Sequence, residues 1–91
     1  MEFQIGNTYM TRGINEAAAE DSVFAQEVWQ SLQRYMLGDW GDMCEADKQS
    51  NDEAVETGER ILAAYETSRG KIWIITEADR SGTVILFPDE Y

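Results

Sequence analysis

The sequence contains no histidine, one cysteine and one proline among its 91 residues. Histidine is the commonest metal ligand and general base, and Cys44 alone forms neither an intrachain disulfide nor a thiolate zinc site. Cys44 also lacks an imidazole that would activate it as a nucleophile, so we expect a small, semi-buried residue near the start of a helix. We therefore predict no metal, no cofactor and no catalytic residue.

Long hydrophobic runs are missing as well. The longest strongly apolar run is Ile72–Ile75, and the first residues show neither the basic stretch nor the apolar stretch of a signal peptide. We therefore expect a soluble, cytoplasmic protein that makes no membrane contact. With 43% hydrophobic residues, the 91 residues are expected to form a single domain, residues 1–91.

Basic residues are scarce: seven Lys and Arg stand against eighteen Asp and Glu, which gives a formal net charge of −11. The imbalance is concentrated between Asp39 and Glu59, where eight acidic residues and one basic residue, Lys48, give a net charge of −7. Such a field repels nucleic acid and anionic lipid and attracts basic surfaces. We therefore expect a basic protein surface as the partner, and no direct binding of nucleic acid or membrane.

The first two thirds of the chain read as helical. Phe24, Val28 and Leu32 recur at helical spacing within a helix predicted at about 23–37, and a second, strongly acidic helix is predicted at about 45–57. A short N-terminal strand is predicted before these helices, because Phe3 and Ile5 alternate with the polar Glu2 and Gln4.

The last third reads as strands. Three β-type runs, at 60–67, 71–76 and 83–87, are separated by short turns, which favours an antiparallel meander. The middle run is apolar on both faces and is therefore predicted to be the central strand. The whole pattern predicts an α+β fold, with N-terminal helices packed on a three- to four-stranded antiparallel sheet.

Two neighbouring segments are candidates for a partner-binding surface. Gly38–Asp42 places a tryptophan between two carboxylates, and forms either a recognition knuckle or a helix–helix corner in which Trp40 fills the core. The carboxylates of the helix that follows either imitate a row of backbone phosphates or form an ordinary solvated face. The candidate partner-binding residues are Asp39, Trp40, Asp42, Glu45, Asp47, Asp52, Glu53, Glu56 and Glu59.

A second polar cluster lies at Thr76–Ser81, at the end of the central predicted strand. Its side chains could bind a small polar ligand or a cation, and two carboxylates at i and i+2 could in principle support acid–base chemistry. The alternative is an ordinary turn in which the arginine neutralises its neighbour. The residues of this alternative ligand site are Glu77, Asp79, Arg80 and Ser81.

Several stretches resemble one family of short bacterial proteins, many of them carried on plasmids or phage-derived elements. The resemblance covers Gly38–Tyr91 well and the N-terminal third loosely. The stretches are Gly38-Asp39-Trp40-Gly41-Asp42, Asp47-Lys48, Asn51, Gly58, Ile61–Tyr65, Lys71–Ser81 and Leu86–Tyr91. Members of the family are labelled "plasmid related protein" and some "type I restriction endonuclease subunit M". The resemblance implies a mobile-element origin and no particular activity, since these 91 residues hold neither an adenosylmethionine loop nor an Asn-Pro-Pro-Tyr-type motif.

Together, these features predict a non-enzymatic, acidic binding protein of mobile-element origin. It would occupy a basic nucleic-acid-binding surface, as a DNA mimic with anti-CRISPR or anti-restriction activity does. One alternative is a small-ligand or enzymatic site around Thr76–Ser81. Another is a plasmid maintenance or regulatory interaction protein.

Overall fold

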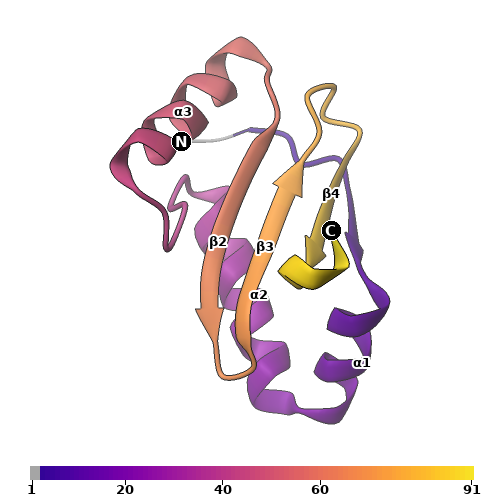
Figure 1. The fold of residues 1–91 in the computed structure, drawn as a ribbon. Coiled ribbons are helices and arrows are strands. Elements are labelled where there is room, and N and C mark those ends of the chain that lie inside the picture. Colours follow the sequence, from indigo (N-terminus) through magenta and orange to yellow (C-terminus); the bar gives the residue numbers. More distant parts are fainter. Residues whose placement is uncertain (1–2) are drawn as a thin grey trace.

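The computed structural model describes residues 3–91, which form three α-helices, a four-stranded sheet and a C-terminal 3₁₀ turn (Figure 1). The predicted α+β fold is confirmed. The elements in chain order are β1 (Asn7–Met10), α1 (Arg12–Glu20), α2 (Ser22–Met36), α3 (Glu45–Thr57), β2 (Ile61–Thr67), β3 (Gly70–Thr76), β4 (Gly82–Leu86) and η1 (Pro88–Glu90).

The sheet has the strand order β1-β4-β3-β2. Strands β2, β3 and β4 form the expected antiparallel meander, in which Ile74 lies between Ala63 and Ile85. Strand β1 pairs with β4 in parallel, so the sheet is mixed and not purely antiparallel. All three helices separate β1 from β4 in the sequence, and no short turn therefore dictates the direction of β1.

The N-terminal strand begins later than expected, at Asn7. Phe3 and Ile5 lie before it and pack against the core, where the Phe3 ring meets the rings of Tyr35 and Trp40 at centroid distances of 5.4 and 5.8 Å. Their alternation with polar residues thus reflects packing of an extended segment and not strand pairing. Glu2, which belongs to the same alternation, lies outside the described residues.

Helix α2 lies across one face of the sheet and supplies much of the core (Figure 1). Asp21 is the N-cap residue of this helix, and its carboxylate accepts hydrogen bonds from the amides of Val23 (3.0 Å) and Phe24 (3.2 Å) in the first turn. The core side chains of α2 and of the sheet face beneath it are Phe24, Val28, Leu32, Tyr35, Ile61, Ala63, Tyr65, Ile72, Ile74 and Ile85.

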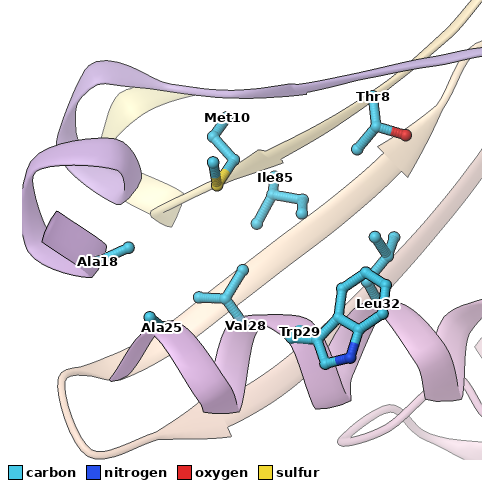
Figure 2. Close-up of a pocket in the computed structure, with 8 residues that line it drawn as sticks. All are labelled: Thr8, Met10, Ala18, Ala25, Val28, Trp29, Leu32 and Ile85. Atoms are coloured by element: carbon cyan, nitrogen blue, oxygen red, sulfur yellow. The ribbon is translucent and has the colours of Figure 1, made fainter. Parts of the chain in front are cut away.

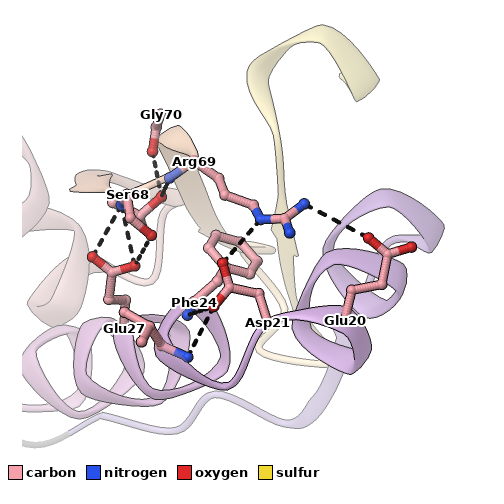
Figure 3. Close-up of polar contacts among 9 residues, drawn as sticks. Glu20, Asp21, Phe24, Glu27, Ser68, Arg69 and Gly70 are labelled. Carbon is pink, nitrogen blue, oxygen red and sulfur yellow. Dashed lines mark hydrogen bonds and ion pairs between the residues drawn. The ribbon is translucent and has the colours of Figure 1, made fainter.

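The tip of the β2–β3 hairpin is anchored on the junction of α1 and α2 (Figure 3). Glu27 accepts hydrogen bonds from the amide of Ser68 (3.1 and 3.0 Å) and from its hydroxyl (2.6 Å). The Arg69 Nε donates to Asp21 at 3.3 Å, and Arg69 also lies 3.9 Å from Glu20. These contacts hold the hairpin against the helices at the end of the molecule remote from α3.

A chain of hydroxyl groups crosses the core. Thr83 donates its single proton to the carbonyl of Ile5 (2.6 Å), so Thr83 accepts from Thr76 (2.7 Å), which in turn accepts from Tyr35 (2.7 Å). Burial raises the pKa of Tyr35 to about 12, so the phenol keeps the proton that it donates. Four segments of the chain are tied together without leaving a buried hydroxyl unsatisfied.

The C-terminal residues fold onto the other face of the sheet, where Tyr91 meets Trp73 edge to face at 5.7 Å. The Glu90 carboxylate accepts hydrogen bonds from the Thr11 hydroxyl (2.6 Å), the Gly13 amide (3.0 Å) and the Phe87 amide (2.9 Å). Burial acts to raise the pKa of Glu90, but these three hydrogen bonds outweigh it and hold that pKa below its usual value. The end of the chain is therefore fastened to the start of α1.

Candidate functional site

Helix α3 is held on the edge strand β2 by a narrow inner face. The Asn51 side chain donates to the carbonyl of Leu62 (2.8 Å) and accepts from the amide of Leu62 (3.4 Å), as a neighbouring strand would. Ala54 is 3% exposed, and Val55 packs against the core beside it. The rest of the helix circumference faces solvent, because the helix has few apolar residues to bury.

The loop before α3 covers the next outward-facing position of β2. The Ala64 amide donates to the carbonyl of Trp40 (3.3 Å), and the Asp42 amide donates to the carbonyl of Ala64 (2.7 Å). Gly41 sits between these two bonds with a φ of 77°. The loop and Asn51 together pair the outward backbone groups of Leu62 and Ala64 on this edge strand.

Trp40 lies in the core and is 2% exposed. Its ring packs edge to face on Tyr35 at 5.4 Å, and its Nε1 donates to the carboxylate of Asp52 (2.9 Å). Of the two alternatives for this residue, the structure shows the core-filling one, and the indole offers no surface to a partner. The tryptophan thus orients α3 through Asp52 instead of contacting a partner itself.

Asp39 and Asp42 are exposed but have basic neighbours. Arg34 donates to both carboxylate oxygens of Asp39, through Nε at 2.7 Å and Nη2 at 3.2 Å, and this hydrogen bonding holds the pKa of Asp39 below its usual value. Asp42 lies 3.4 Å from the Nζ of Lys71. Both acids therefore contribute less to the field around α3 than their formal charge suggests.

The other six candidate acids define what we call the acidic surface. They are Glu45, Asp47, Asp52, Glu53, Glu56 and Glu59. All six are exposed, and within residues 3–91 none forms an ion pair with a lysine or arginine. At about 100° of rotation per residue, Glu45, Glu53 and Glu56 point to the side of α3 opposite Asn51.

Five of the seven basic residues are paired with acids outside the acidic surface. They are Arg12, Arg34, Arg60, Arg69 and Lys71. Arg80 binds backbone carbonyls, and Lys48 is the one basic residue within α3 itself. The concentration of negative charge that the sequence predicted is therefore present on the folded surface.

The four side chains of the alternative ligand site do not converge. Ser81 donates to Asp79 through its amide (2.9 Å), and hydrogen bonds from the side chain and amide of Ser81 lower the pKa of Asp79. Glu77 lies 3.7 Å from Arg60, and Arg80 turns toward α3. The structure thus brings Asp79 and Ser81 together within a turn and directs Glu77 and Arg80 away from them.

Arg80 instead clamps the C-terminal end of α3. Its guanidinium donates to the carbonyls of Ala54 (2.7 Å), Glu59 (2.7 Å) and Glu77 (3.2 Å), and its backbone adopts a left-handed φ of 60°. The helix dipole favours a positive charge at the C-terminal end of a helix. The Arg80 guanidinium therefore offsets the unfavourable negative charges of Glu53 and Glu56 near this end of α3. Sequence reasoning missed this role because the clamp joins residues more than twenty positions apart.

Arg80→Ala is expected to lower the free energy of unfolding by about 2–3 kcal/mol, because three carbonyls lose a charged donor. Arg80→Lys should recover only part of this loss, since a single ammonium does not reproduce the fork of the guanidinium. Chemical denaturation measures both effects. Arg12→Ala, which removes an exposed ion pair with Glu16, is the control and should leave the free energy of unfolding unchanged. Equal losses of stability in Arg80→Ala and in this control would contradict the clamp.

Cys44 is the N-cap residue of α3 and is exposed, not semi-buried as expected. Its side chain makes no capping hydrogen bond. The first turn carries Glu45 and Asp47, whose negative charges suit the positive end of the helix dipole.

Comparison of the chain with protein-family models, with curated proteins and with solved structures gave no match. No helix in residues 3–91 is both long enough and apolar enough to cross a membrane. In the same part of the chain, no cluster of cysteine and carboxylate side chains is arranged to hold a metal ion.

Proposed function

We propose that this chain is a non-enzymatic, cytoplasmic binding protein whose acidic surface docks onto a basic, nucleic-acid-binding surface of another protein. The observation that carries this proposal is the set of six exposed carboxylates on and beside α3 that have no counter-ion within residues 3–91. A surface of one sign attracts a partner of the opposite sign and speeds its association.

The spacing of these carboxylates supports mimicry of a nucleic-acid strand. Five of the six lie within the 13 residues of α3, which span ~20 Å at ~1.5 Å per residue. That is one carboxylate per ~4 Å, close to the ~3.4 Å between successive phosphates of one DNA strand. A basic channel that holds a phosphate backbone would thus find a comparable density of charge along α3, to which Asp47 contributes from the side that faces β2.

The attachment of α3 also supports this role. Asn51 fixes the middle of the helix on β2, and Arg80 fixes its C-terminal end. Side chains on a rigid helix lose less conformational entropy on binding than side chains on a mobile segment, so more of the electrostatic attraction is available as affinity. A mobile-element origin, which the resemblance implies, would make a DNA-handling defence complex the partner, whereas a plasmid maintenance complex is the other candidate.

The proposal predicts that Glu45→Gln, Glu53→Gln, Glu56→Gln and Glu59→Gln together abolish capture of the partner while the fold is retained. Asp52 is left unchanged because it accepts the Trp40 hydrogen bond. The captured protein should itself bind duplex DNA, and added DNA should displace it from the wild-type chain. Binding should weaken steeply as salt is raised, because the interface is electrostatic. Pull-down from nuclease-treated lysate, followed by titration of the purified partner, measures these effects.

The matched control removes four charges elsewhere: Glu16→Gln, Glu20→Gln, Glu66→Gln and Asp89→Asn. It has the same net charge as the first variant but keeps the acidic surface intact, so it should bind like the wild type. Equal loss in both variants would show that net charge alone is responsible. Undiminished binding by the α3 variant, or tight binding of duplex DNA by the free wild-type chain, would sink the proposal.

A further inference from the structure

One side of α2 carries no charge, although the chain as a whole has a net charge of −11. Trp29, Gln33 and Met36 project from this side, and Trp29 and Met36 are 57% and 44% exposed. The two charged residues of α2, Glu27 and Arg34, lie on the other side, where they bind the hairpin tip and Asp39. Large apolar side chains with no charges among them are typical of the centre of a protein–protein interface.

Trp29 borders an apolar groove of about 500 Å³ between β1 and the two helices beside it. Figure 2 shows Thr8 and Met10 on the β1 side of this groove, and Trp29 and Leu32 on the α2 side. Ile85 of β4 lines it between them. Met10 is 46% exposed, so the groove is open to the surroundings.

Strand β1 is the sheet edge beside this groove, and all four of its residues are exposed. Alternate residues of a parallel strand bond to the neighbouring strand, and the amides of Asn7 (3.3 Å) and Thr11 (3.0 Å) donate to the β4 side. Thr8 and Met10 therefore direct their backbone groups away from β4. On the opposite edge, β2, the outward backbone groups of Leu62 and Ala64 are already bonded by Asn51 and by the loop before α3, so β1 is the more open edge within the described residues.

We propose that this face is the contact surface of a homodimer, in which β1 of one copy pairs antiparallel with β1 of a second copy. A twofold axis brings the same strand into antiparallel register with itself, so one surface is complementary to its own copy. The outward backbone groups of Thr8 and Met10 then find partners in the second strand. The two grooves meet on one face of a continuous sheet, where the Trp29 side chains cover them.

Charge favours a second copy as the occupant. Two chains of net charge −11 repel each other wherever their acids approach. The face formed by Thr8, Met10, Trp29, Gln33 and Met36 holds no acid, so two copies can meet there without opposing like charges. A basic partner, in contrast, finds no carboxylate on this face to attract it.

The net charge also determines how dimerisation depends on salt. The remaining acids of the two copies still repel each other at long range, and salt screens this repulsion. Dimerisation should therefore strengthen as salt is raised, whereas docking of the acidic surface on a basic partner should weaken. The two proposals thus fail independently of each other.

Sedimentation equilibrium of the full chain tests the dimer at about 0.1 M and about 1 M NaCl, where the Debye length falls from ~10 to ~3 Å. The wild type should show a monomer–dimer equilibrium with a lower dissociation constant at high salt. Trp29→Ser should raise that constant at least about tenfold, because a central aromatic contact is lost. Thr8→Pro should do the same, because proline removes an outward amide without breaking the pairing with β4.

Val23→Ser is the control, since Val23 is 60% exposed and lies on α2 away from the groove. It should leave the dissociation constant unchanged, and circular dichroism should show that all three variants are folded. A wild type that stays monomeric at both salt concentrations overturns the proposal. Binding of an extended apolar peptide at β1 would not rescue it, because the proposed occupant of this face is a second copy of the chain. A dimer that Val23→Ser weakens as much as Trp29→Ser, or that Thr8→Pro leaves unchanged, overturns it as well.

Discussion

Gly41→Ala is expected to lower the free energy of unfolding by about 3 kcal/mol or more. Gly41 has a φ of 77°, which costs an L-residue ~1–2 kcal/mol. A Cβ at this position would also clash with the carbonyl oxygen of Ala64 and lie 2.6 Å from the Cδ1 of Tyr65. The loop would have to move away from β2 and give up the hydrogen bonds on either side of Gly41, at ~1 kcal/mol each.

Gly58→Ala is the matched control for this substitution. Gly58 has a similar φ of 84°, but no atom lies within 4 Å of where its Cβ would be. Its substitution therefore carries only the conformational cost of the left-handed backbone, about 1–2 kcal/mol. Chemical denaturation of both variants separates backbone strain from the close approach of the loop. Equal losses of stability in the two variants would mean that the loop moves away from β2 without a measurable cost, and that its hydrogen bonds to Ala64 do not stabilise the fold.

Phe24→Ala is expected to lower the free energy of unfolding by about 3–5 kcal/mol, through lost burial and an unfilled cavity. Phe24 is completely buried and stacks on Phe87 at 5.7 Å, so its ring joins α2 to the C-terminal segment. A domain of this size has a total stability of roughly 5–10 kcal/mol. The variant should therefore unfold at a much lower denaturant concentration and be partly unfolded at 37 °C.

Val23→Ala provides the comparison at the neighbouring position. Val23 is 60% exposed, and its contribution to the cap of α2 comes from its amide, which alanine retains. The expected change in stability is below about 0.5 kcal/mol. If Phe24→Ala were as mild as Val23→Ala, the first turn of α2 would not be packed on the sheet as the structure has it.

Local patterns predicted the elements that depend on residues close in sequence. The apolar spacing of Phe24, Val28 and Leu32 indicated α2, because a helix brings residues three or four apart onto one face. The short turns between the last three runs indicated the meander, because a strand that returns through a few residues pairs antiparallel with the one before it. Within the predicted strand runs, Leu86 is buried, whereas Trp73 is half-buried, because the C-terminal turn covers its face of the sheet in part.

The direction of β1 and the roles of Trp40 and Arg80 depended on tertiary structure. Arg80 and the end of α3 are far apart in the sequence, and no local rule indicates which carbonyls a guanidinium will reach. Trp40 had two consistent interpretations, and the choice depended on the cavity that Phe3, Tyr35 and α3 leave for it. The open groove beside Trp29 was missed for the same reason, since its walls come from four separate elements.

The sequence by itself determined the α+β class, the positions of the main helices and of the meander, and the excess of negative charge, because these follow from short-range periodicity and from composition. Only the tertiary structure decided which carboxylates keep their charge uncompensated. Arg34 and Lys71 fold back toward Asp39 and Asp42, whereas no basic residue in the described chain pairs with Glu53 or its neighbours on α3. Ion pairing depends on distances of a few ångströms, and only the folded chain defines those distances.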